Sequence, residues 1–306
     1  MARADGVRPR GRRTLLLALA VVALGAGALF VARVLSQATG ARGMLADASG
    51  LLSQAEPTVL AVDQAVRSEV TTAAADAALA ALEKLEPSIE TLNEAKSVVA
   101  RARQRLAERD RPLADALDEA IAARLEMLER ARPVLEADVA VAQALVPAVE
   151  AWTLVGQAEK MADEAVASFN KHTKDGVQRS TKLTTDADAL LARARSNLET
   201  VTAGFPEADM GPFISYIDAK RALLAESRKI DATWLSGKVA DANAMLGAYN
   251  AREKQVAEQA KRLPGTPASV LAEAYKRAVE ADVTAYFEAR ERARSADAKI
   301  RSLQGG

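Results

Sequence analysis

Few side chains in this sequence could carry out metal or acid–base chemistry. The chain has one histidine, His172, and no cysteine among its 306 residues. Metal and acid–base sites usually combine several of His, Cys, Asp and Glu, whereas His172 lies in a lysine-rich stretch beside Asp175-Gly176, a pair typical of a turn. We therefore expect His172 to be a solvated loop residue, with no metal bound and no catalytic role.

The acidic residues do not form a calcium-binding pattern. Asp186 and Asp188, like the group of Asp115, Asp118 and Glu119, lack the glycine and the ligand spacing of a calcium loop. They fit solvent-exposed helix faces instead, where carboxylates pair with basic residues three or four positions away.

Motifs of the common enzyme classes are missing. The chain contains no GxxxxGK[ST], GxGxxG, GxSxG or HExxH pattern. The segment Ser236-Gly237-Lys238 carries the residue types of a Ser–Lys dyad, but no strained turn or set of oxyanion-stabilising donors accompanies it. We therefore predict a protein that is not an enzyme, has no catalytic residues and binds no cofactor.

One loop concentrates the scarce aromatic residues, which make up only 4% of the chain. Between glycine and proline residues it holds Phe205, Phe213, Tyr216 and Ile217. Such a loop either closes the end of a helical bundle, which we favour, or presents an apolar surface to a partner.

The two tryptophans, Trp152 and Trp234, also allow two interpretations. A buried tryptophan usually anchors a core, because its large ring removes much apolar surface from water. The alternative is a ligand pocket between helices that the two rings line.

An uncharged apolar segment follows the basic N-terminus. A helix of some 20 apolar residues spans a hydrocarbon core of roughly 30 Å. We predict a cytoplasmic tail over residues 1–13, a transmembrane helix over residues 14–35 and, because positive charge stays cytoplasmic, an extracytoplasmic body. The alternative is a signal peptide, cleaved near Ala26-Gly27-Ala28, that leaves the body secreted.

The rest of the chain is rich in alanine, leucine, glutamate, arginine and lysine, which favour helix over strand. Prolines after charged residues suit the first turn of a helix, and their alternative is a kink inside a longer one. Asp231 and Thr266 are candidate helix caps. These signals predict helices near residues 57–85, 88–109, 112–131, 134–172, 180–202, 213–229, 231–262 and 268–303.

Apolar residues within these helices recur in steps of three and four, which places them on one face. Leu117, Ile121 and Leu125 are an example, and between Leu235 and Leu263 only Glu253 breaks such a series. We predict an all-α fold: an N-terminal transmembrane helix, then an extended antiparallel helical bundle or coiled-coil-like ectodomain. Its segments would be residues 36–175 and 176–306, or one continuous bundle.

The function that fits best is a structural or protein-interaction role in the cell envelope, with a membrane anchor and a protein partner. A homo-oligomer is a further expectation. The alternatives are a sensory or ligand-binding ectodomain that signals through a membrane partner, and a secreted helical protein. Residues 1–35 hold six arginines and one aspartate in a chain of zero net charge, so the body is acidic. Nucleic acid is not expected as a partner, because binding it needs a concentrated basic face.

Overall fold

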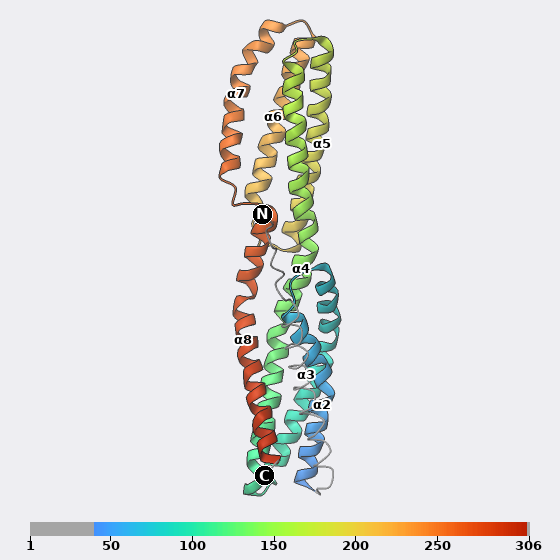
Figure 1. Ribbon diagram of the computed structural model, residues 1–306, viewed down its shortest axis with the longest axis vertical. Helices are drawn as coiled ribbons and strands as arrows, with labels where there is room; N and C mark the ends of the chain where they lie inside the picture. Colours follow the sequence, from blue (N-terminus) through green and yellow to red (C-terminus); the bar gives the residue numbers. More distant parts are fainter. Residues whose placement is uncertain (1–39, 305–306) are drawn as a thin grey trace, which may run out of the picture. The chain divides into compact units, whose positions relative to one another are not determined.

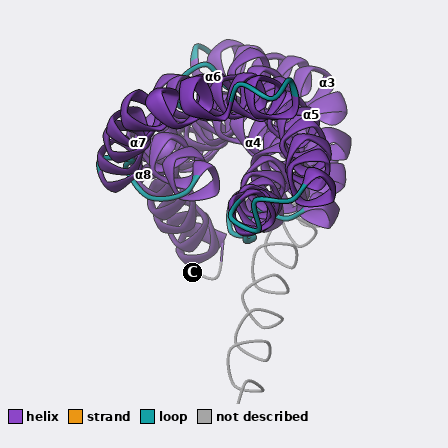
Figure 2. Cartoon of the chain, turned by 90° about the horizontal axis from the view of Figure 1, so that it is seen from above, coloured by secondary structure: helices purple, strands orange, loops and turns teal. Residues whose placement is uncertain are grey.

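The computed structural model describes residues 40–304, and the regular elements among them are all helices (Figure 2). The predicted all-α class is confirmed. The predicted tail over residues 1–13 and transmembrane helix over residues 14–35 lie outside the described residues. In chain order the long helices are α2 (Ala41–Val66), α3 (Thr72–Arg103), α4 (Arg111–Phe169), α5 (Lys174–Gly204), α6 (Gly211–Leu235), α7 (Val239–Lys261) and α8 (Pro267–Gln304).

The chain divides into two compact units. Among the described residues, unit 1 comprises those up to Val139 together with those from Val279 onward, and unit 2 comprises Ala140–Ala278. Unit 1 therefore contains α2, α3, the first half of α4 and most of α8, while unit 2 contains α5, α6, α7 and the remainder of α4 and α8 (Figure 1). The sequence-based division at residue 175 falls in unit 2, near the turn between α4 and α5.

Most of the prolines do not begin helices. Pro57 lies inside α2 and Pro87 inside α3, so the predicted helix starts at these positions are wrong. An internal proline costs a helix about 3 kcal/mol. In α2 the buried face continues across Pro57, from Leu52 to Val59, and packing of that face offsets the cost. Of the prolines at the first four predicted helix starts, Pro112 alone lies at a helix start, because α4 begins at Arg111.

The first break among the described helices comes instead after Val66. Thr71 caps α3, since its side-chain oxygen accepts a hydrogen bond from the backbone N–H of Ala74 at 3.1 Å. A threonine cap is a weaker sequence signal than a proline, which explains why the prolines obscured this boundary.

The turn between α4 and α5 uses a left-handed histidine rather than a glycine. His172 has a φ of 50°, and Thr173 caps α5 by accepting a hydrogen bond from the N–H of Gly176 at 3.1 Å. Gly176 was predicted to lie in a turn between helices, but it lies in the first turn of α5. A Cβ there would come within 2.5 Å of the carbonyl oxygen of Ser168, so this glycine permits close packing of the turn.

Asp231 does not cap a helix. It lies in the last turns of α6, where it is buried, and the helix ends only at Leu235. The chain then turns at Gly237, whose φ of 83° suits glycine, and α7 begins at Val239. Ser236-Gly237-Lys238 is thus the turn between α6 and α7.

The core of unit 1 is shared among four helices. Its buried residues come from α2, α3, α4 and α8 and include Leu52, Leu92, Ile121 and Ala293. Leu117 and Ile121 are at most 2% exposed, which confirms the predicted inward face of this part of α4. Alanine fills many of the remaining core positions, so the helices approach closely but each contact buries little area.

Among the described residues, one helical stretch is long and apolar enough to cross a membrane. It covers Glu108–Phe169, and its most apolar 18-residue window has a mean hydropathy of 1.5, with 39% of the window buried. The window's apolar character alone does not distinguish a bundle helix from a span, since buried core helices share it.

Candidate functional site

The sequence-predicted loop residues are buried inside unit 2. Phe205, Phe213, Tyr216 and Ile217 are at most 4% exposed. The Tyr216 hydroxyl donates a hydrogen bond to Oε1 of Glu159 at 2.5 Å, which joins α6 to α4. Burial, then this hydrogen bond, raises the pKa of Tyr216. These residues lie in the interior of unit 2, and the surface they leave for a partner in this conformation is small.

The two tryptophans do not line a common pocket. The ring of Trp152 contacts Phe213 edge to face, with ring centroids 5.6 Å apart and planes at 81°. Trp234 packs instead against the small cluster that contains Phe169 and Ile230. The structure therefore brings Trp152 to one of the predicted loop residues and keeps Trp234 in another part of unit 2.

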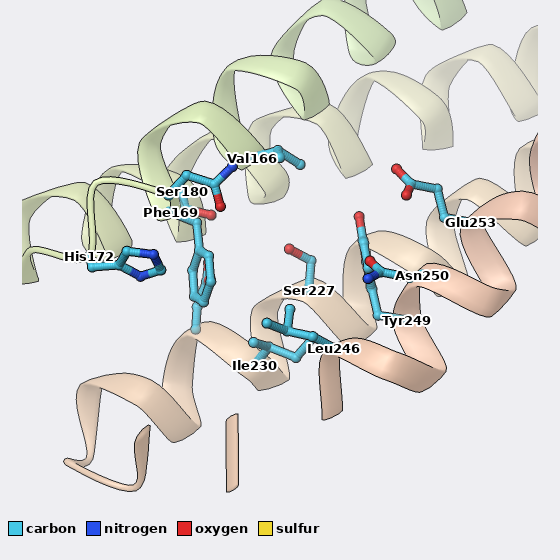
Figure 3. A pocket seen from close by; sticks show the side chains of 12 residues that line it. Val166, Phe169, His172, Ser180, Ser227, Ile230, Leu246, Tyr249, Asn250 and Glu253 are labelled. Carbon is cyan, nitrogen blue, oxygen red and sulfur yellow. The ribbon is translucent and has the colours of Figure 1, made fainter. Parts of the chain in front are cut away.

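Unit 2 has a cavity of about 250 Å³ that the sequence did not reveal. Side chains from α4, α5, α6, α7 and the turn after α4 line it, and Figure 3 shows them converging on one space. The lining residues are Val166, Phe169, Asn170, His172, Ser180, Ser227, Ile230, Asp231, Leu246, Tyr249, Asn250 and Glu253.

The apolar wall of the cavity is made of side chains from several helices. Phe169 and Ile230 belong to a buried cluster against which Leu246 and Tyr249 pack. The imidazole of His172 lies edge to face with the Phe169 ring, at a centroid distance of 6.0 Å, and forms part of the rim. A wall with two aromatic rings favours a ligand that has an apolar body.

Asp231 is the most buried ionisable group of the cavity, at 1% exposed. The hydroxyl of Thr181 donates a hydrogen bond to its Oδ2 at 3.0 Å, and Ser180 donates another. Burial raises the pKa of Asp231, and the two hydroxyl hydrogen bonds only partly oppose that rise. Among the described residues, no ion pair involves Asp231.

The pKa of Tyr249 reflects both burial and the acidic side chains around the cavity. Burial, and then the carboxylates of Glu253, Asp231, Glu226 and Asp163, together raise the pKa of Tyr249 to about 12. Glu226 is compensated by an ion pair with Arg252. Asp231 and Glu253 are the carboxylates that line the cavity, and such groups favour a positively charged ligand over an anion.

The arrangement has the properties of a binding site. It offers acceptor oxygens, hydroxyl groups and aromatic faces. In residues 40–304 no three His, Cys, Asp or Glu side chains come close enough together to hold a metal ion.

Comparison with known proteins gives no relative: no family model, no curated protein and no solved structure matches this chain. The properties of the cavity are therefore inferred from its lining residues.

Two residues of the cavity stood out in the sequence, although neither indicated a cavity. Glu253 is the one charged residue that interrupts the apolar series of α7, and it lines the cavity. Asp231 was a candidate helix cap, but it lies inside α6 and is buried. Both residues were instead assigned ordinary roles, as a break in the pattern and as a cap.

Proposed function

We propose that this chain is a membrane-anchored helical protein whose unit 2 binds a small molecule, and that it acts by binding rather than by catalysis. The observation that carries the proposal is the cavity in unit 2, which has an apolar aromatic wall and a buried carboxylate. Binding sites for small molecules have this composition: a mainly apolar lining with a few convergent polar groups.

The membrane location that we propose is inferred from the sequence alone. The apolar segment over residues 14–35 behind a group of arginines favours an anchor with the body outside the cytoplasm. Protease added to intact cells with a permeable outer layer should degrade the body. A body that is degraded only after lysis would contradict this topology.

The ligand-binding proposal is tested with the purified full chain in detergent. A library that contains cationic, neutral and anionic compounds is screened for compounds that raise the melting temperature. A ligand of the folded state stabilises it by RT ln(1 + [L]/Kd), about 2.7 kcal/mol at a hundredfold excess over Kd. We expect saturable hits, and a library without any hit would overturn the proposal.

The site of each hit is assigned with a blocking variant. Ser227→Trp places a large ring in the cavity and should abolish the shift in melting temperature. Ser215→Trp is the matched control, because Ser215 is an exposed serine on the same helix, α6. Hits that survive Ser227→Trp while its circular dichroism matches that of the parent would place the binding elsewhere.

A second candidate function is a protein interaction, and a specific surface favours it. Val146 is 61% exposed and Val149 is 50% exposed, three positions apart on one face of α4. Large apolar side chains exposed side by side are typical of protein contacts. Cross-linking in native membranes should give adducts that Val146→Arg with Val149→Arg removes and that Leu79→Arg, at an exposed leucine of unit 1, retains.

A further inference from the structure

Asp231 is a buried charge that the fold does not neutralise with a cation. Two carboxylates in unit 1, Glu56 and Asp63, are each 4% exposed, and each pairs with an arginine. Asp231 is 1% exposed and has hydroxyl partners only. A buried carboxylate without a positive partner is costly, so a cation from outside the chain would complement it.

The surroundings of Asp231 strengthen the preference for positive charge. Glu253 adds a second carboxylate at the exposed rim of the cavity, and Figure 3 shows its side chain directed over the space that Tyr249 and Ser227 face. The rings of Phe169 and Tyr249 add a further attraction, because the face of an aromatic ring draws cations.

A bare metal ion does not fit this lining. Calcium and magnesium need about six oxygen ligands, and in the described part of the chain no three acidic or histidine side chains come together. The wall that Val166, Ile230 and Leu246 form would leave much of such an ion without ligands. An occupant with a positive end and an apolar body matches both halves of the lining.

We infer that the cavity of unit 2 takes a small organic cation, an amine or quaternary ammonium compound whose charged group lies near Asp231 and whose apolar part contacts Phe169 and Leu246. This inference rests on the proposed function and narrows it to one class of ligand.

The test uses pairs of compounds that share a shape and differ in charge. The pairs are choline with 3,3-dimethylbutan-1-ol, benzylamine with benzyl alcohol, and cyclohexylamine with cyclohexanol. Calorimetric titration of the full chain in detergent should give a Kd at least tenfold lower for the cation in one or more pairs. The inference is wrong if no cation exceeds its neutral counterpart by that factor.

Variants on α6 connect the charge preference to Asp231. Asp231→Asn keeps the shape and the hydrogen-bond acceptor but removes the charge, so it should weaken binding of the preferred cation at least tenfold and change binding of the alcohol less than twofold. Asp218→Asn is the control, because Asp218 lies on the same helix and pairs with Arg195 at the surface, 3.0 Å away. The control should bind the cation within twofold of the parent. Equal losses in both variants would contradict the assignment to Asp231.

The two proposals fail in different ways. Neutral or anionic hits in the library, removed by Ser227→Trp and unmatched by any cation, would overturn the cation assignment and leave small-molecule binding in place. A library and a set of pairs that both bind nothing would overturn both.

Discussion

Unit 1 and unit 2 both bury acidic side chains, and they differ in what faces those side chains. In unit 1, Arg124 is 2% exposed and donates hydrogen bonds to Glu56 on α2, at 3.0 Å, and to Asp297 on α8, at 2.9 Å. In unit 2, Asp231 faces hydroxyl groups and a cavity. The charged pairs of unit 1 therefore join helices to one another, while the buried carboxylate of unit 2 has no cation from the described chain.

A second cluster in unit 1 follows the same pattern. Arg290 donates two hydrogen bonds to the carboxylate of Asp63, at 2.6 and 3.0 Å, and the hydroxyl of Tyr286 donates a third at 3.0 Å. Such contacts form only when α2 and α8 have one particular register. Buried polar groups of this kind add little net stability but penalise other registers, as a single buried polar residue does in coiled coils.

The direction of the pKa shift does not separate the two units, because burial raises the pKa of Glu56 as well as that of Asp231. What separates them is the group that opposes the effect of burial. For Glu56 it is the charge of Arg124, and for Asp231 it is the hydroxyl groups of Ser180 and Thr181.

The largest effect is expected from Arg124→Met. This change leaves Glu56 and Asp297 in the core of unit 1 without a cation, which typically costs about 3–5 kcal/mol of unfolding free energy. Urea unfolding of the full chain, followed by circular dichroism, measures the loss. Arg130→Met is the control on the same helix: Arg130 is half exposed and pairs with Asp282, so its loss should cost about 0–1 kcal/mol. Similar losses in both variants would mean that Arg124 does not act as a buried partner.

A smaller effect is expected when one hydroxyl is removed from a tyrosine of each unit. Tyr286→Phe removes a buried hydrogen bond to the charged Asp63 and should cost about 1.5–3 kcal/mol. Tyr249→Phe removes a hydroxyl that faces the cavity and should stay within about 0.5 kcal/mol of the parent. Both tryptophans lie in unit 2, so their fluorescence follows Tyr249→Phe, and circular dichroism follows Tyr286→Phe. A Tyr249 variant as unstable as the Tyr286 variant would remove the proposed difference between the units.

The smallest effect is a dependence on pH at Asp231. The folded-state pKa of Asp231 lies above its unfolded value of about 4. The folded state therefore holds the proton more tightly, and stability is lost as pH rises from the unfolded pKa through the folded one. The side chain of the Asp231→Asn variant has no proton to lose. Its free energy of unfolding should therefore rise relative to that of the parent as pH increases across this window, by about 1.4 kcal/mol for each unit of pKa shift. Tryptophan fluorescence during urea unfolding at several pH values measures this rise, and a difference that does not change with pH would contradict a raised pKa for Asp231.

The helical class and most helix interiors could be predicted from the sequence, because residues of high helix propensity and apolar steps of three and four act locally. Leu117 and Ile121 are examples of correct inward positions. The helix boundaries were harder, since Pro57 and Pro87 carry a strong local signal that packing of the surrounding face overrides.

The cavity could not be predicted, because it depends on which helices become neighbours. Asp231 and Thr181 are 50 residues apart, and no local pattern connects a carboxylate on α6 with a hydroxyl on α5. The same holds for Arg124 and Asp297 in unit 1, which are 173 residues apart. The residues of the predicted aromatic loop are buried, with Phe213 against Trp152 and Tyr216 bonded to Glu159, and their proposed role in binding a partner stays a prediction.

The shallow packing of α7 has a consequence for how the cavity exchanges its contents. This helix buries only Ala242 and Val256, whereas α5 buries nine residues. Local opening of a helix requires less free energy when fewer contacts must be broken, so α7 should open locally more often than α5. Because α7 also carries Tyr249 and Glu253, each such fluctuation would move part of the cavity wall outward. The residence time of a bound molecule would then be set by the motion of this one helix.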